Sequence, residues 1–198
     1  MIRNAVLASA LAGCATLASG QEFSLTLVPS SFTLECIDGS LTVSVYGDAD
    51  VGTHILGGAF GLDVSDGAPF ITGITWNPAA WSQFNTDGGY AGSGVHNQVI
   101  FGQLVIPGIF PPAAGSELGS LIGSFEITYA QPGPVLMDLN LIAGVPFSLE
   151  TVDAVTGQTF RNDSGNLTIN NATVLICPSP SGCAAFAVLG VFSTRRRR

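Results

Sequence analysis

The residues best suited to catalysis are a serine and a histidine that lie close together in the chain. Ser93 sits between two glycines in the segment 92–94, and His96 follows it. A serine hydrolase needs a nucleophile on a sharp turn, an adjacent base and an acid that orients the base. The segment lacks the Gly-x-Ser-x-Gly pattern, and the acids are too dispersed for their spacing to mark out a catalytic pair. We therefore expect the chain not to be an enzyme.

A second chemistry that the sequence allows is the binding of a hard cation. Asp48 and Asp50 lie in one turn-forming segment, and carboxylate oxygens are ligands that Ca²⁺ prefers. The pair is similar to the start of an EF-hand loop, but the later ligands and the terminal glutamate are absent. Asp and Gly also occur together in ordinary surface turns. We expect no cofactor, with Ca²⁺ at these two residues as the alternative.

A third chemistry is the stacking of aromatic rings on sugars. The segment from Trp76 to Gly94 is rich in aromatic and glycine residues, and such a long loop is uncommon unless it packs on itself or binds something. Trp76 continues the alternation of the strand before it, which indicates a core residue. The remaining rings form a candidate carbohydrate platform: Trp81, Phe84 and Tyr90.

The distribution of charge limits the classes of partner. Residues 21–194 contain one basic residue, Arg161, and fourteen acids, which gives 1 − 14 = −13. Nucleic-acid binding needs clustered cations, so this composition excludes it. The acidic surface could attract divalent cations or basic partners, and it could equally serve solubility alone.

The elements that position these residues are predicted to be β-strands. Short β-branched or aromatic runs alternate with turn clusters, and long helical patterns are missing, which is typical of an all-β antiparallel sandwich of about eight or nine strands. Alternation places Leu41, Val43 and Val45 on one face, and Phe60, Leu62 and Val64 on another. The other predicted strands are 31–36, 99–105, 124–129, 136–142, 147–152 and 166–176.

Two local features of these strands are also predicted. Asp38-Gly39 lies between the runs 31–36 and 40–46, which indicates a hairpin. The run 166–176 changes phase near Asn170-Asn171, which indicates a bulge. The proline-containing segment 107–115 is expected to be a long connection at a sheet edge.

The amino terminus indicates export. Arg3 is followed by an apolar stretch and then by small residues before Gln21, so residues 1–20 have the pattern of a secretory signal peptide. Leu11-Ala12-Gly13-Cys14 also fits a lipobox, with cleavage before Cys14 as the alternative. Both routes export the chain.

The carboxyl terminus indicates sorting. Pro178 and Pro180 precede an uncharged run and a terminal cluster of basic residues, Arg195, Arg196, Arg197 and Arg198. Arginines next to an apolar segment resist passage through a bilayer, and the apolar part is shorter than the roughly 20 residues of a stable span. Residues 178–198 are therefore expected to act as a transient membrane anchor, leaving residues 21–177 as the folded domain.

This ending resembles the bacterial PEP-CTERM sorting signal, with Pro178-Ser179-Pro180 in place of Pro-Glu-Pro. The resemblance implies a membrane-embedded, exosortase-like protease as a partner. It also implies a location at the bacterial cell envelope, at the cell surface or outside the cell.

Two cysteines constrain the domain. Cys14 leaves with a standard signal peptide and Cys183 lies in the tail, so Cys36 and Cys177 are expected to form a disulfide in an oxidising exterior. A free thiol at Cys36 and a Cys177–Cys183 bridge are the alternatives.

The first half of the domain has a characteristic order of features: Leu41–Val45, the polar loop 47–54, the Gly-Gly-aromatic strand 57–64 and the segment Ile74–Pro78. This order resembles cohesin-type and related carbohydrate-binding sandwiches. The resemblance implies a jelly-roll-like sandwich and transfers no binding site. The sequence thus predicts an exported structural or adhesion protein of the envelope or extracellular matrix, with a carbohydrate-binding module for extracellular polysaccharide as the alternative.

Overall fold

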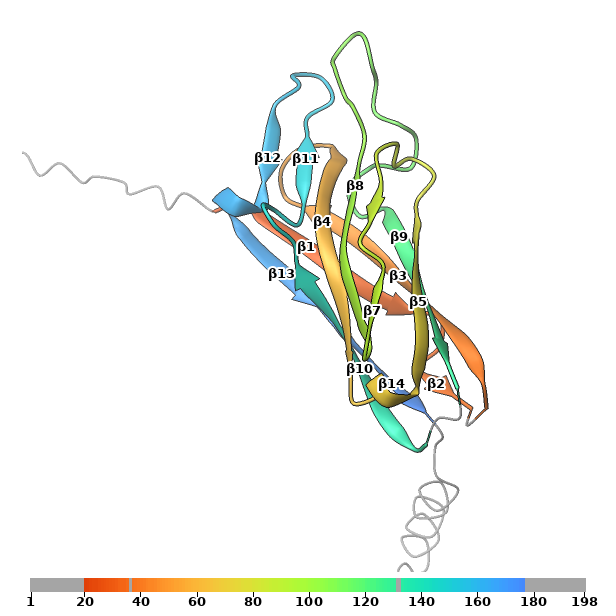
Figure 1. Cartoon of the computed structure of the whole chain (residues 1–198). Coiled ribbons are helices and arrows are strands. Elements are labelled where there is room, and N and C mark those ends of the chain that lie inside the picture. Colours follow the sequence, from red (N-terminus) through yellow and green to blue (C-terminus); the bar gives the residue numbers. More distant parts are fainter. Residues whose placement is uncertain (1–19, 36, 131–132, 177–198) are drawn as a thin grey trace, which may run out of the picture.

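The computed structural model describes residues 20–35, 37–130 and 133–176, which fold into two β-sheets packed face to face (Figure 1). The first sheet has five strands, in the spatial order β13 (Asn166–Asn170), β1 (Glu22–Pro29), β3 (Gly39–Ala49), β9 (Leu121–Tyr129) and β5 (Ile71–Pro78). Two 3₁₀ turns, η1 (Ala68–Phe70) and η2 (Asn162–Ser164), lie between strands. The predicted all-β sandwich is confirmed.

The second sheet is organised around one long strand. Its main path runs β12 (Thr159–Arg161), β11 (Glu150–Val152), β4 (His54–Ser65), β10 (Val135–Ala143), β14 (Ala172–Ile176) and β2 (Thr33–Leu34). The strand β8 (Val95–Gly102) pairs with the edge of β4 opposite β10. It also pairs with the short strands β6 (Thr86–Asp87) and β7 (Tyr90–Gly92). The strand count exceeds the prediction because five of the strands contain only two or three residues: β2, β6, β7, β11 and β12.

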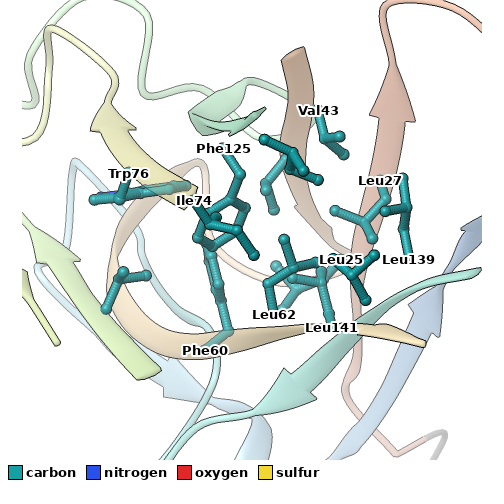
Figure 2. Close-up of a cluster of buried hydrophobic side chains, with 14 of the residues drawn as sticks. Leu25, Leu27, Val43, Phe60, Leu62, Ile74, Trp76, Phe125, Leu139 and Leu141 are labelled. Atoms are coloured by element: carbon teal, nitrogen blue, oxygen red, sulfur yellow. The ribbon is translucent and has the colours of Figure 1, made fainter. Parts of the chain in front are cut away.

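The core lies between the sheets and follows the predicted alternation. Leu41, Val43 and Val45 of β3 are buried, and they face the inward side chains of β4 and β10. Figure 2 shows leucines from both sheets interdigitating in this space. The burial of the predicted inward residues Phe60, Leu62 and Val64 is confirmed as well.

Aromatic rings join the two sheets at one end of this core. Phe60 of β4 contacts Trp76 of β5 edge to face, with ring centroids 5.4 Å apart, and Trp76 lies 4.8 Å from Phe125 of β9 (Figure 2). Phe101 of β8 completes the cluster, 5.3 Å from Phe60. Because Trp76 is buried here, its predicted core role is confirmed.

Two predictions of local structure are wrong. The segment around Thr33 does not form a hairpin with β3; β2 instead pairs in parallel with β14 in the other sheet. The predicted bulge near Asn170-Asn171 is a change of sheet: β13 pairs in parallel with β1, and β14 pairs antiparallel with β10. Asn171 sits at the crossing, where its Oδ1 accepts the Leu141 N–H. A one-strand alternation pattern cannot reveal such a switch, because both halves keep an inward-facing phase.

Several predictions fall on residues that the structure does not describe. The predicted Cys36–Cys177 disulfide, residues 1–19 of the predicted signal peptide 1–20 and the predicted tail 178–198 lie outside the described residues. Within the described part of the chain, no helix has both the length and the hydropathy of a membrane span.

We predict that Phe60→Ala lowers the free energy of unfolding by about 3–5 kcal/mol, because it removes the ring that touches aromatic partners from both sheets. Chemical denaturation followed by tryptophan fluorescence measures the change. Phe84→Ala is the matched control: Phe84 is 60% exposed, so its loss should stay within about 0.5 kcal/mol. Equal losses in both variants would contradict the central role of Phe60.

Candidate functional site

The residues considered for catalysis are not brought together. Ser93 lies in the turn between β7 and β8, whereas the His96 side chain is fully buried against Phe125. The His96 Nδ1 lies 2.9 Å from the Asn97 carbonyl oxygen. Its Nε2 lies 3.2 Å from Asp87 Oδ1, a distance that suits an ion pair, although the two atoms are not aligned as a hydrogen bond. The His96 ring therefore lies in the core beside Phe125 and is not placed to activate Ser93.

The candidate calcium ligands are engaged in backbone hydrogen bonds. Asp50 Oδ1 accepts the Glu22 N–H at 2.8 Å, and Asp48 Oδ1 accepts the Ala49 N–H at 2.9 Å. Among residues 20–35, 37–130 and 133–176, no cluster of three or more His, Cys, Asp or Glu side chains is placed to hold a metal ion. Calcium binding at Asp48 and Asp50 stays a prediction.

The predicted sugar platform does not form as expected. Trp81 is only 4% exposed, and its Nε1 donates to the Leu121 carbonyl at 2.7 Å, so its ring cannot stack on a ligand. Tyr90 is half-buried, and its hydroxyl donates to the Ile71 carbonyl at 3.1 Å. The sequence placed these rings in one loop, but packing against β9 and β5 draws two of them inward. Phe84 alone of the three presents an exposed ring.

Phe84 lies at the edge of an apolar groove of about 270 Å³ on the second sheet. The groove floor is backbone from β4 and β8, where Gly57 pairs with Gly102. One side is formed by Phe84 and Ile100. The other is formed by the segment between β10 and β11, which includes Val145 and Phe147.

Glycine is required at the floor of this groove. A Cβ on Gly57 would lie 2.7 Å from the Phe101 carbonyl oxygen and 3.2 Å from the Gly102 Cα. A Cβ on Gly58 would overlap the Ser148 carbonyl oxygen. Side chains at these positions would therefore separate β4 from its neighbours. The Gly-Gly pair allows close packing and leaves bare backbone at the bottom of the groove.

The second wall is held by two amide side chains. Gln98 of β8 donates from Nε2 to the Val145 carbonyl at 2.9 Å and accepts the Val145 N–H at 3.2 Å. Asn162 accepts the N–H groups of Ser148 and Leu149 at 2.7 and 2.8 Å. These contacts satisfy the backbone of the segment that the sequence predicted as the start of a strand, so β11 begins only at Glu150.

The charge in the groove is internally balanced. Glu150 is the one acidic residue among the lining residues, and its Oε1 accepts the Arg161 Nε–H at 2.7 Å. The hydrogen bond and the charge of Glu150 raise the pKa of Arg161 above its usual value. The guanidinium carbon lies 4.8 Å from the centre of the Phe147 ring. The one arginine of the described residues thus neutralises the groove and supports its wall.

Sequence reasoning missed most of this site. Gly57 and Gly58 were assigned only to a strand, and Gln98, Val145 and Asn162 carried no signal of a shared location. The usable hint was the Gly-Gly pair inside a strand pattern, which often marks the close approach of another backbone.

The sandwich is similar to solved cohesins, although no protein-family model and no curated protein matches the sequence. The seventh ScaB type I cohesin from Pseudobacteroides cellulosolvens matches with a TM-score of 0.50 and 8% identity, over 80% of this chain and 94% of that one. The chain has a cohesin-like fold.

Two further solved cohesins match with lower TM-scores. The cohesin of the Coh-OlpA–Doc918 complex from Clostridium thermocellum has a TM-score of 0.47 and 11% identity, over 77% of this chain and 99% of that one. The non-cellulosomal cohesin from Archaeoglobus fulgidus has a TM-score of 0.41 and 10% identity, over 83% and 97%.

One carboxylate close to the groove end of the sandwich is predicted to respond to acid. Asp153 Oδ1 accepts the N–H groups of Thr156 and Val155 at 2.8 and 2.9 Å in the turn between β11 and β12. Hydrogen bonds, first of all from the Thr156 backbone, lower the pKa of Asp153. The turn is therefore stabilised above the ordinary aspartate pKa of about 3.9, and this stabilisation is lost as the pH falls through the lowered value.

The amide shifts of Val155 and Thr156, followed by NMR during an acid titration, measure this effect. We expect their common midpoint below the value of an unperturbed aspartate, and no such midpoint in Asp153→Asn. A midpoint at or above the ordinary value would contradict the assignment.

Proposed function

We propose that this chain is an exported, non-catalytic cohesin-like module that binds another protein through the groove between Phe84 and Phe147. The observation that carries the proposal is the groove itself. It is apolar, it is formed by hydrogen-bonded walls, and its single carboxylate is neutralised by Arg161. Preformed concave sites of this kind bind apolar groups at low ordering cost.

The dimensions of the groove favour an apolar side chain of a partner as its occupant. Interfaces are dominated by a few apolar or aromatic anchors that fill pockets on the other surface. Bare backbone at Gly57 and Gly102 lets such an anchor approach the sheet closely. Cohesin complexes with dockerins, such as the one from Clostridium thermocellum, are protein–protein assemblies, but the groove supports this proposal without that likeness.

The terminal segments of the sequence support a proposal about where the protein is located in the cell. Residues 1–20 export the chain, and residues 178–198 hold it at the membrane until an exosortase-like protease removes them. The module then acts as a structural or adhesion component of a bacterial envelope or extracellular matrix. Support for this part comes from the apolar and arginine pattern of the sequence alone.

Site-specific photo-cross-linking in the native host tests the groove. A benzoylphenylalanine at position 84 should give a discrete protein adduct, because Phe84 lies at the groove edge. The matched control is position 32, since Phe32 is 62% exposed and Phe84 is 60% exposed. Ile100→Glu should reduce the adduct at least about tenfold, because it places a charge in an apolar contact.

Leu136→Glu serves as the second control, since Leu136 is exposed on β10 and does not line the groove. Equal adducts from positions 84 and 32, or an adduct with polysaccharide alone, would contradict protein binding at the groove.

The sorting part has a separate test. The protein recovered from its host should have an intact mass that begins at Gln21 and ends near Pro180, two mass units below the reduced value if Cys36 and Cys177 are bridged. A lipid on Cys14 with the arginines still present would contradict tail processing.

A further inference from the structure

The loop that follows β8 presents large apolar side chains to solvent. Residues 103–116 contain no charged residue, and Ile109 is 68% exposed. Of the fifteen large hydrophobic residues that are exposed in the described part of the chain, seven lie in this loop or in the groove lining: Phe84, Ile100, Leu104, Ile106, Ile109, Phe110 and Val145. We call this combined surface the apolar face. An exposed apolar patch of this kind is typical of an interface.

Hydrogen bonds within the 103–116 loop and at its base fix the conformation in which its tip is exposed. The N–H groups of Ile109 and Phe110 both donate to the Ile106 carbonyl, at 3.0 and 2.8 Å, and Ile106 N–H donates back to Phe110. At the base, buried Gln103 donates to the Ile55 carbonyl at 2.7 Å and accepts the Ala113 N–H at 2.8 Å. A turn fixed by these hydrogen bonds therefore carries Ile109 and Phe110, which are 68% and 50% exposed.

The projecting loop and the groove are neighbours. Gln103 both begins the loop and lines the groove. Phe84 is tied to the same point, because its N–H donates to the Gly102 carbonyl at 2.9 Å. In Figure 1 the loop between β8 and β9 projects beyond the ends of the sheets. One face thus combines an apolar projection with an apolar hollow, which is the shape that a two-fold symmetric interface requires.

Charge points to a second copy as the occupant. The described residues carry fourteen acids against one arginine, so two copies repel each other over most of their surfaces. In the groove lining and the 103–116 loop the only charges are Glu150 and, adjoining it, Arg161, which are paired with each other. A basic partner would gain nothing from this uncharged face. Two acidic copies would therefore repel each other less at this uncharged face than over the rest of their surfaces.

We propose that the chain forms a symmetric dimer in which the 104–110 loop of each protomer lies on the groove of its partner. This inference rests on the proposed function and names its partner: a second copy of this chain. Apolar contact drives the association, and the net negative charge of both protomers opposes it.

Analytical ultracentrifugation of the full chain over a concentration series tests the dimer. We expect a monomer–dimer equilibrium that strengthens between low and high salt, because salt screens the repulsion between the two acidic bodies. Binding to a basic partner would show the opposite dependence. Ile109→Glu and Ile100→Lys should each weaken dimerisation at least about tenfold, because each places an unpaired charge in an apolar contact.

The decisive experiment mixes the two charged variants. Ile109→Glu and Ile100→Lys, each monomeric alone, should form a heterodimer when mixed, because the new charges face each other across the interface. Leu136→Glu is the control and should dimerise like the unaltered chain. Unchanged thermal unfolding of the variants, all at exposed positions, shows that the fold is intact.

A monomer at all salt and protein concentrations would overturn the dimer, as would Ile100→Lys dimerising normally. This result is separable from failure of the proposed function. If the chain is monomeric but position 84 still cross-links to a different protein, the groove binds a partner and only the dimer is lost. If the chain dimerises and position 84 gives an adduct only with a second copy, self-association stands without a second protein; a dimer that gives no adduct at position 84 would overturn the placement of the interface at the groove.

Discussion

The structure depends on the close approach of the segment 144–149 to the central strand β4. Gly58 allows this approach, because any side chain there would overlap the Ser148 carbonyl. Gly144 makes the reciprocal contact against Ala59. Once this packing is in place, β11 can pair with the first residues of β4, and the groove acquires its second wall. The site is thus a consequence of how two backbones meet.

The core and the site share this strand but use it differently. Phe60 turns inward and joins the aromatic rings of both sheets. Gly57, three residues earlier, shows only backbone to the groove. The register irregularity of the β4–β11 pairing lies earlier in the strand, between Ile55 and Gly57. The distribution of charge also distinguishes the apolar face from the rest of the surface. Carboxylates are spread over the sandwich, whereas at the apolar face the one carboxylate, Glu150, is paired with Arg161.

Most of the fold could be predicted because the alternation of apolar and polar residues along a strand shows which side chains are buried. Val43, Leu62 and Phe125 lie in strands whose period matches the pleat, and each is fully buried. Only part of the groove site could be predicted from the sequence. Trp81 and Phe84 are three residues apart in one loop, yet one is locked in the core by a hydrogen bond to Leu121 and the other is exposed. Composition cannot separate them, because the difference arises from contacts with strands distant in sequence.

By itself the sequence determined the all-β class, the inward faces of the long strands and the strongly acidic character of the domain. These properties depend on local alternation and on composition, which need no knowledge of neighbours. Only the tertiary structure decided that β2 pairs with β14, that the last run changes sheet at Asn171 and that Gln98 and Asn162 hold one wall of a groove. These features join residues far apart in the chain, and such pairings are selected by the packing of the whole sandwich rather than by any one segment.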